Sequence, residues 1–225
     1  MDSPSRFSRA WLAFAIGVPL AWAALLWFHP DVDRNHVYAD LRDDVVAYQV
    51  VHVGTLVFIG LIGLILYLLV RDLPGRAARI SRLAIGPFVL FYGAYEAVIG
   101  LAVGALVQHG NDAPVRQRPA VADAIQSSAD NVIVGDPGVL ASVGALAWVV
   151  AVLAAAVAYR RVGAPVVATV LLGLSLVIVS HPPPIGPIGL LCFAGAVALL
   201  ARHEHVSSRL ETAPPVPTPK LGARA

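Results

Sequence analysis

The sequence predicts an all-α, polytopic membrane protein, a bundle of six transmembrane helices with both termini in the cytoplasm. Of its 225 residues, 58% are hydrophobic and only 13% are charged, against roughly 25% charge in an average soluble domain. The mean hydropathy is +0.75, and the apolar residues gather in runs long enough to cross ~30 Å of hydrocarbon. This composition excludes a disordered chain, a fibrous repeat and a water-soluble globule.

Six apolar runs are expected to span the membrane within one domain, residues 1–206. They cover residues 11–28, 45–70, 83–107, 139–159, 164–180 and 185–201. The last two are separated only by His181 and three consecutive prolines. Because proline fixes φ and lacks an N–H, it ends one helix and suits the first turn of the next. We therefore expect spans five and six to form a tight hairpin.

The two ends of the chain require separate interpretations. Two arginines followed by an Ala-Trp-Ala tripeptide at 21–23 imitate a signal peptide with its cleavage site. The apolar run continues to Phe28, however, and its final aromatic pair resembles an interfacial anchor, so the first span is expected to be retained. Residues 207–225 are rich in proline and poor in apolar side chains, which predicts a disordered cytoplasmic tail.

The basic residues predict how the spans are oriented. Cytoplasmic loops carry an excess of Lys and Arg. With six spans, 12 of the 16 basic residues lie on the same side of the membrane as the N-terminus. The other four are Arg34, Arg42, Arg116 and Arg118. This distribution favours cytoplasmic N- and C-termini in the plasma membrane and places residues 29–44 and 108–138 outside.

Local signals refine these elements. In the outer loops, residues 40–44 are expected to extend the second helix, and residues 115–127 to form a short surface helix. Pro87 should kink or locally unwind the third span. The Gly100-x-x-x-Gly104 pattern provides a small surface for close helix contact, within the bundle or between two copies of the chain.

Glu96 is the strongest candidate for a functional side chain, because ionisable groups are costly in hydrocarbon and are functional hypotheses by default. At 1.5 Å per residue it lies roughly 16 Å below the outer end of the third span. It must be protonated, paired or facing a wet cavity, and Tyr92, one turn earlier, shares its helix face. We expect Glu96 to act as an acid or base with Tyr92 beside it. The alternative is a structural tether between two helices.

His52 is the second candidate. Asp44, Tyr48 and His52 are spaced i, i+4 and i+8 on the second span, so they form one stripe along that helix. An acid, a phenol and an imidazole aligned in this way can orient or relay a proton. Alternatively, Asp44 and Tyr48 are ordinary residues at the water boundary, and His52 only hydrogen-bonds a neighbouring carbonyl.

Together these residues predict one polar pocket that opens to the extracytoplasmic side. His29, His36, His52, His109 and His181 all fall outside or in the outer part of the membrane under this topology. We expect Glu96 and His52 to be catalytic together with Tyr92. The pocket lining is expected to include Tyr48, Asp44, Tyr95, Trp148 and His181. His181 has an alternative role as a helix-end histidine favoured by the helix dipole.

The sequence does not predict a metal site, and it leaves the cofactor unknown. His52, Glu96 and His181 are suitable ligands for zinc or iron, and a haem held by two histidines, His52 and His181, is geometrically possible. The helical rise, however, places Glu96 several ångströms deeper than His52, and no HxxxH or ExxH spacing puts two ligands on one helix. The single cysteine, Cys192, excludes an intramolecular disulfide and a cysteine-based metal site.

Three classes of function stay open. The first is a membrane-embedded acid–base enzyme that acts on a lipid or isoprenoid-like substrate through Glu96 and His52. The second is a small proton- or cation-coupled transporter, and the third is a non-catalytic membrane subunit. The cytoplasmic halves of the spans are almost wholly apolar, which favours a one-sided pocket over a conduit. Expected partners are membrane lipids and a lipophilic small molecule, with a homo-oligomer left open. The basic residues form no continuous stripe that would bind nucleic acid.

Overall fold

The computed structural model describes residues 8–212, and these residues form helices and connecting loops without a β-strand. Five helices within this range are long and apolar enough to cross a membrane. They are α1 (Arg9–Leu26), α3 (Val45–Val70), the continuous helix Gly75–Asp112, α8 (Val139–Arg161) and α10, of which Ile185–Glu204 counts as the span. The predicted all-helical membrane architecture is confirmed at this level.

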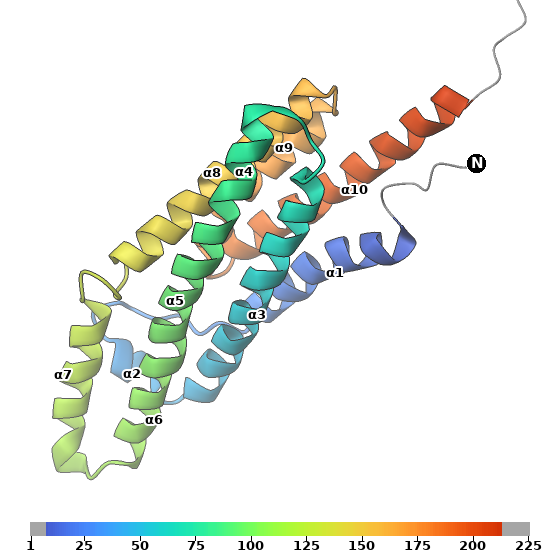
Figure 1. The fold of residues 1–225 in the computed structure, drawn as a ribbon. Coiled ribbons are helices and arrows are strands. Elements are labelled where there is room, and N and C mark those ends of the chain that lie inside the picture. The colour runs from blue at the N-terminus through green and yellow to red at the C-terminus, as the bar shows by residue number, and fades with distance from the viewer. Residues whose placement is uncertain (1–7, 213–225) are drawn as a thin grey trace, which may run out of the picture.

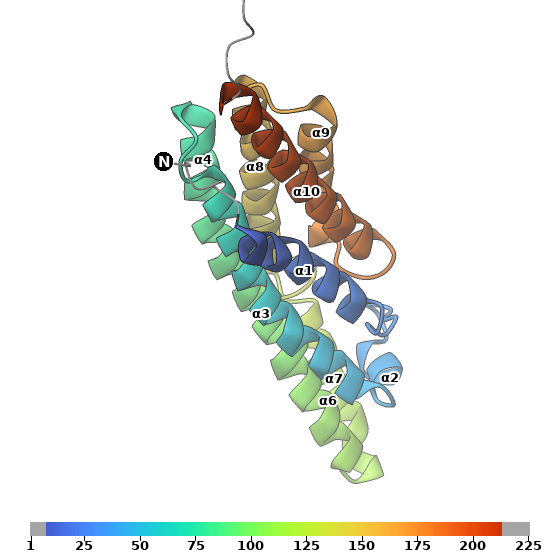
Figure 2. The same ribbon diagram turned by 90° about the vertical axis from the view of Figure 1, so that its right-hand side faces the viewer.

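The fifth predicted span is shorter than expected. Residues 164–180 contain α9 (Val166–Leu174), which continues as the 3-10 helix η4 (Ser175–Val179). At 1.5 Å per α-helical residue and 2.0 Å per 3-10 residue, the two together are about 24 Å long. This is less than the ~30 Å hydrocarbon core, because prolines flank the helix closely on both sides. The helix packs along α10, so the two form the predicted hairpin, whose loop contains Pro182 to Pro184 (Figure 2).

The helices run between two ends of an elongated bundle (Figure 1). The start of α1 and the far end of α10 lie at the same end of the bundle. The short helices α2 (Val37–Leu41) and α7 (Arg118–Ala129) lie at the other end. α1 packs on α10 and α3, while α4 (Gly75–Pro87) packs on α8. We call the end that carries α2 and α7 the pocket end.

The long helix Gly75–Asp112 contains two π-helical segments, one before Glu96 and one after it. After α4 come η1 (Phe88–Tyr92), α5 (Gly93–Glu96), η2 (Ala97–Ala102) and α6 (Val103–Asp112). The first π-turn begins directly after Pro87, whose ring cannot donate a backbone hydrogen bond. The predicted local unwinding at Pro87 is therefore present. Such π-turns occur frequently at functional sites.

Two glycines let α3 and the long helix approach each other closely. A Cβ atom on Gly100 would lie 2.3 Å from Cβ and Cγ of His52, and one on Gly104 would lie 2.7 Å from Cγ of Gln49. The Gly100-x-x-x-Gly104 pattern therefore supports packing within the bundle. A buried hydrogen bond from Nε1 of Trp22 to Oγ1 of Thr55, 3.1 Å, also joins α1 to α3.

The loops at the pocket end match one prediction and correct another. The expected surface helix at 115–127 is present as η3 (Val115–Gln117) followed by α7. Residues 40–44 do not extend α3, because α2 ends at Leu41 and a turn precedes the new helix start at Val45. Leu41 and Val45 are both buried, which anchors the chain on each side of this turn.

The predicted tail lies partly inside the described range. α10 (Ile185–Thr212) continues past residue 207 as a helix. The rest of the predicted tail, residues 213–225, lies outside the described residues.

Candidate functional site

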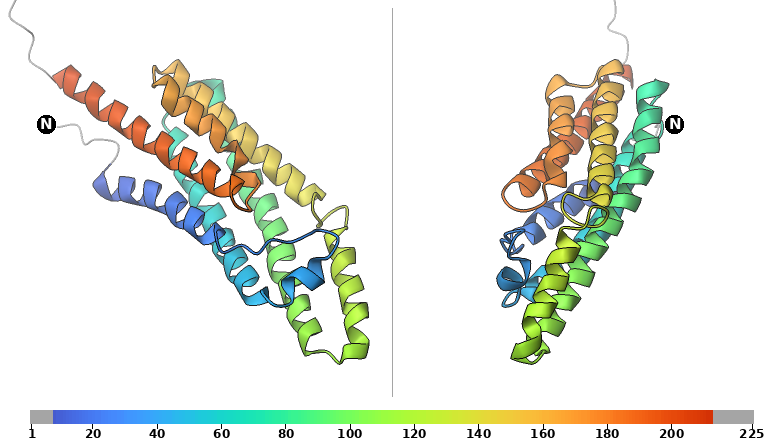
Figure 3. Two further views of the ribbon diagram at one scale, coloured as in Figure 1. Left: turned by 180° about the vertical axis from the view of Figure 1, so that it is seen from behind. Right: turned by 90° about the vertical axis from the view of Figure 1, so that its left-hand side faces the viewer.

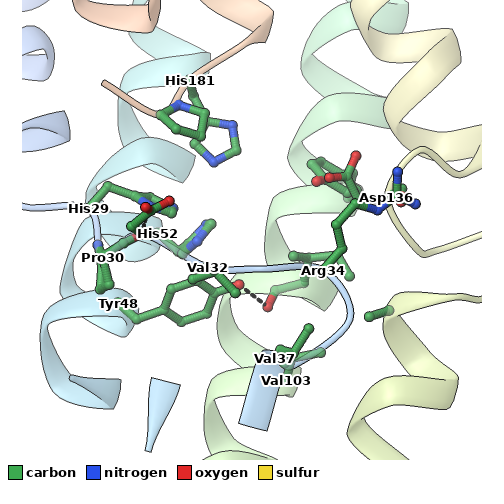
Figure 4. A pocket seen from close by; sticks show the side chains of 15 residues that line it. His29, Pro30, Val32, Arg34, Val37, Tyr48, His52, Val103, Asp136 and His181 are labelled. Atoms are coloured by element: carbon green, nitrogen blue, oxygen red, sulfur yellow. Dashed lines mark hydrogen bonds between the residues drawn. The ribbon is translucent and has the colours of Figure 1, made fainter. Parts of the chain in front are cut away.

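Three histidines from separate segments meet at the pocket end (Figure 4). His29 follows α1, His52 lies on α3, and His181 lies between η4 and α10. Their ring centroids are 5.2 Å apart for His29 and His52, 5.1 Å for His29 and His181, and 5.6 Å for His52 and His181. One ring nitrogen from each lies within 4.8 Å of the other two. We call this set the histidine cluster.

Glu96 lies behind the histidine cluster and contacts two of its members. Its carboxylate is fully buried, and Oε2 accepts a hydrogen bond of 2.6 Å from Nδ1 of His52. The other oxygen, Oε1, lies 3.5 Å from Nδ1 of His181 and makes no hydrogen bond. One carboxylate therefore faces two imidazoles that come from different parts of the chain.

The three imidazoles each use Nδ1 for a hydrogen bond to oxygen. Nδ1 of His29 donates to the carbonyl of Pro30 at 2.7 Å, and Nδ1 of His52 donates to Glu96. The hydroxyl of Tyr92 donates its proton to the carbonyl of Val179 at 2.7 Å. Its oxygen therefore accepts from Nδ1 of His181 at 3.2 Å. A neutral imidazole that carries its proton on Nδ1 has a free lone pair on Nε2.

Burial keeps the two loop histidines neutral at pH 7. It lowers the pKa of His29 to about 4, and the nearby His52 ring adds to this effect. Burial also lowers the pKa of His181 to about 4, although Glu96 opposes the shift. Both rings are consequently available as proton acceptors or as metal ligands, because either role needs an unprotonated nitrogen.

The histidine cluster forms one wall of a cavity of about 150 Å³. Polar lining residues are His29, Asp31, Arg34, Tyr48, His52, Tyr95, Asp136 and His181. Val37, Ile99 and Val103 supply an apolar wall. Figure 4 shows the histidines on one side and Arg34 beside Asp136 on the other.

Contacts between distant loops hold the mouth of this cavity. The guanidinium of Arg34 donates to the backbone carbonyl of Asp136. The side chain of Gln126, on α7, donates to the carbonyl of Arg34 at 2.7 Å. The segment between α1 and α2 thus runs across the pocket end to the start of α8 (Figure 3). It carries His29 into the site.

The residues predicted from the sequence separate into three groups. Tyr48, Tyr95, His52 and His181 line the cavity. Glu96 and Tyr92 are buried behind the histidines and are not part of the lining. The hydroxyl of Tyr48 donates to the carbonyl of Ile99 at 2.8 Å, which ties α3 to the long helix.

Asp44 and Trp148 lie elsewhere. Asp44 is the residue before α3 and is exposed to solvent. Of the expected stripe of Asp44, Tyr48 and His52, only Tyr48 and His52 therefore line the cavity. Trp148 is buried between Phe88 and Phe193 and donates from Nε1 to the carbonyl of Ser175. Its ring packs in the core against η1 and α10 instead of facing the cavity.

The expected difference in depth between Glu96 and His52 is present, but it does not keep their side chains apart. His52 lies level with Gly100 across the contact between α3 and the long helix. Glu96 is four residues before Gly100, about 6 Å farther from the pocket end at 1.5 Å per residue. The side chains span this offset, because Oε2 of Glu96 lies 2.6 Å from Nδ1 of His52.

The sequence does not indicate Arg34 and Asp136 as cavity residues, and it places His29 only among the five histidines on the outer side. One signal points to His29: the dipeptides His29-Pro30 and His181-Pro182 each follow an apolar run, and both lie on the same side of the predicted topology. Arg34 and Asp136 carry no comparable signal, since their positions depend on contacts between loops about a hundred residues apart.

Comparisons of the chain with protein-family models, curated proteins and solved structures give no significant match. The chemical role of the site is therefore inferred from its residues, their burial and their hydrogen bonds. An imidazole oriented by a carboxylate, with its second nitrogen facing a cavity, is suited to accept a proton from a bound molecule or to bind a metal ion.

Proposed function

We propose that this chain is an integral membrane enzyme whose reaction centre is the cavity beside the histidine cluster. The observation that carries this proposal is the buried hydrogen bond of 2.6 Å between Glu96 and Nδ1 of His52, with His52 itself lining the cavity. A carboxylate fixes the tautomer and orientation of an imidazole and stabilises its protonated form. In this role His52 is the general base that contacts substrate or water.

Glu96 acts through His52 in this proposal. It is fully buried and absent from the cavity lining, so a substrate in the cavity reaches the imidazoles first. Glu96 is therefore a positioning residue. Tyr92 has the corresponding role for His181, because its hydroxyl lies 3.2 Å from Nδ1 of that ring.

The orientation follows the distribution of basic residues. We propose six membrane crossings, with α9 and η4 as the shortest, and cytoplasmic N- and C-termini in the plasma membrane. Two observations support this choice. Twelve basic residues lie on the side of the membrane that carries both termini, and both described chain ends lie at the same end of the bundle. The cavity then opens to the extracytoplasmic side.

The proposed substrate is lipophilic, of the lipid or isoprenoid class. A cavity of about 150 Å³ holds a group about as large as benzene, so a lipid would insert only its reactive group. Val37, Ile99 and Val103 would contact an apolar portion, and Arg34 and Asp136 would contact a polar one. The apolar surface of the bundle would hold the remaining chain among the membrane lipids.

The test compares the products of three purified proteins in lipid nanodiscs that contain a total lipid extract from the native membrane. The proteins are the wild type, the Glu96→Gln variant and the matched control Asp44→Asn, which changes an exposed acid outside the cavity. Mass spectrometry should find a lipid converted by the wild type and the control, with conversion reduced at least a hundredfold in Glu96→Gln. Equal lipid profiles for all three proteins would overturn the proposal in favour of a structural role or transport.

A further inference from the structure

The histidine cluster presents two buried hydrogen-bond acceptors with no donor for them, beside the third imidazole, His181. Each imidazole uses Nδ1 to donate to oxygen, on Pro30, Glu96 or Tyr92 respectively. Nε2 of His29 and Nε2 of His52 are buried and make no hydrogen bond. A buried polar atom without a partner is costly. A cation uses both of these lone pairs together with a ring nitrogen of His181, which lies within 4.8 Å of the other two ligand atoms.

We infer that His29, His52 and His181 bind one divalent first-row transition-metal ion through their Nε2 atoms. Imidazole nitrogen is a ligand that suits Zn²⁺, Cu²⁺, Ni²⁺ and Fe²⁺. Three protein ligands with a fourth position left for water or substrate are typical of catalytic zinc. With the ion bound, Nε2 of His52 is a ligand and no longer a free base, so a water on the ion would supply the base at the proposed reaction centre. Binding itself does not depend on any catalytic activity.

The surroundings of the three rings match those of metal-binding histidines. Such histidines nearly always donate their other N–H to a carboxylate, a backbone carbonyl or water, which fixes the tautomer and raises the basicity of the ligand. Here Glu96 is the carboxylate for His52 and Pro30 is the carbonyl for His29. Glu96 faces the Nδ1 side of His52 and His181, so it acts as a partner of the ligands and is not itself a ligand.

The spacing of the cluster allows a metal ion after a small closure. Nitrogens that bind zinc at about 2.1 Å in a tetrahedron lie about 3.4 Å from one another. One ring nitrogen from each histidine lies within 4.8 Å of the other two, so the nitrogens need to approach one another by up to about 1.4 Å. His29 and His181 lie on loops, which move more easily than His52 on the packed face of α3. All three histidines line the cavity, so the fourth position of the ion faces the proposed substrate.

Charge compensation also favours a cation at this position. Three neutral imidazoles leave the ion's two positive charges uncompensated, and Glu96 supplies a carboxylate one hydrogen bond away through His52. Asp31 and Asp136 also line the cavity. The basic Arg34 is held at the opposite side by the carbonyl of Asp136 (Figure 4).

The test uses the full-length chain without a polyhistidine tag, purified in detergent and stripped with a chelator. Co²⁺ is titrated while its visible ligand-field absorption is recorded, and Zn²⁺ is then added as a competitor. We expect one ion per chain and the intense spectrum of a four-coordinate site. His29→Gln, His52→Gln and His181→Gln should each weaken binding at least tenfold, and Glu96→Gln ten- to a hundredfold.

Two matched controls replace histidines outside the cluster. His36 is 69% exposed at its side chain, and His109 is exposed on α6. His36→Gln and His109→Gln should bind Co²⁺ like the wild type. Far-UV circular dichroism of each protein separates loss of the site from loss of the fold, and the double variant His29→Gln, His181→Gln tests the site while leaving the packed ring of His52 in place.

The possible outcomes separate this inference from the proposed function. Co²⁺ binding that is equally strong in the wild type and in folded cluster variants would overturn the metal site. If the lipid assay nevertheless detected conversion that needs His52, the enzyme would stand without a metal. Stoichiometric binding that the cluster variants abolish would establish the metal site even if no lipid were converted.

Discussion

The substitution Gly100→Ala should disturb the site by pushing on His52, although it replaces no polar side chain of the site. The Cβ of an alanine there would lie 2.3 Å from Cβ and Cγ of His52 and 2.6 Å from its Nδ1. These distances are far below a normal contact, so His52 or the α3 backbone must move. Overpacking of this kind typically costs about 1–3 kcal/mol, and a weakened charge-assisted hydrogen bond to Glu96 adds about 1.5–3 kcal/mol.

The matched control is Gly93→Ala on the same long helix, where an added Cβ meets nothing within 4 Å. Replacing a helical glycine by alanine favours the helix by roughly 0.5–1 kcal/mol, so this control should be neutral or slightly stabilising. Thermal unfolding in detergent measures both variants. At roughly 2–4 °C per kcal/mol for a chain of this size, Gly100→Ala should lower Tm by about 5–24 °C. Equal Tm values for the two variants would refute the close contact between α3 and η2.

Three further predictions follow from the site and the topology. Glu96→Gln should preserve the fold while abolishing lipid conversion, whereas Glu96→Ala should also lower Tm; full activity of Glu96→Gln would exclude the positioning role of this carboxylate. In the metal-free protein, Tm should fall as the pH drops from 6.5 to about 4, because His29 and His181 bind protons in the unfolded chain over this range but not in the folded one. Substitution of both by Gln should reduce this dependence, and an unchanged slope would count against their burial. After Cys192→Ser, a cysteine at Asn111 should react with a membrane-impermeant thiol reagent only from the extracytoplasmic side, and labelling from the cytoplasmic side alone would reverse the proposed orientation.

The features of the fold that depend on composition were predictable from the sequence. Apolar runs locate the long helices because hydrocarbon requires continuous apolar segments whose backbone groups bond internally. The surface helix at 115–127 and the hairpin that α9 and η4 form with α10 follow from local signals such as proline placement. The 3-10 geometry of η4 (Ser175–Val179) did not follow from any local signal.

The site was predicted in part, and the missing parts are those that depend on tertiary contacts. Glu96, His52 and His181 could be selected because each is a polar residue in or beside an apolar run. Their convergence could not be calculated from helical rise, because the side chains of Glu96 and His52 bridge an offset of one turn and His181 reaches Glu96 from a loop. The place of His29 depends on Arg34, Asp136 and Gln126, which hold its loop across the pocket end, and no local pattern encodes that contact.

The measurement that decides whether the three histidines act as one site is the X-ray absorption spectrum of the zinc-loaded, full-length protein. The account predicts three imidazole nitrogens at about 2.0–2.1 Å, with one further oxygen or nitrogen scatterer from water or substrate. His29→Gln, His181→Gln should lose two of the imidazole contributions. A first shell of oxygen alone, a sulfur scatterer at about 2.3 Å, or an imidazole signal that is unchanged in this double variant would contradict the account.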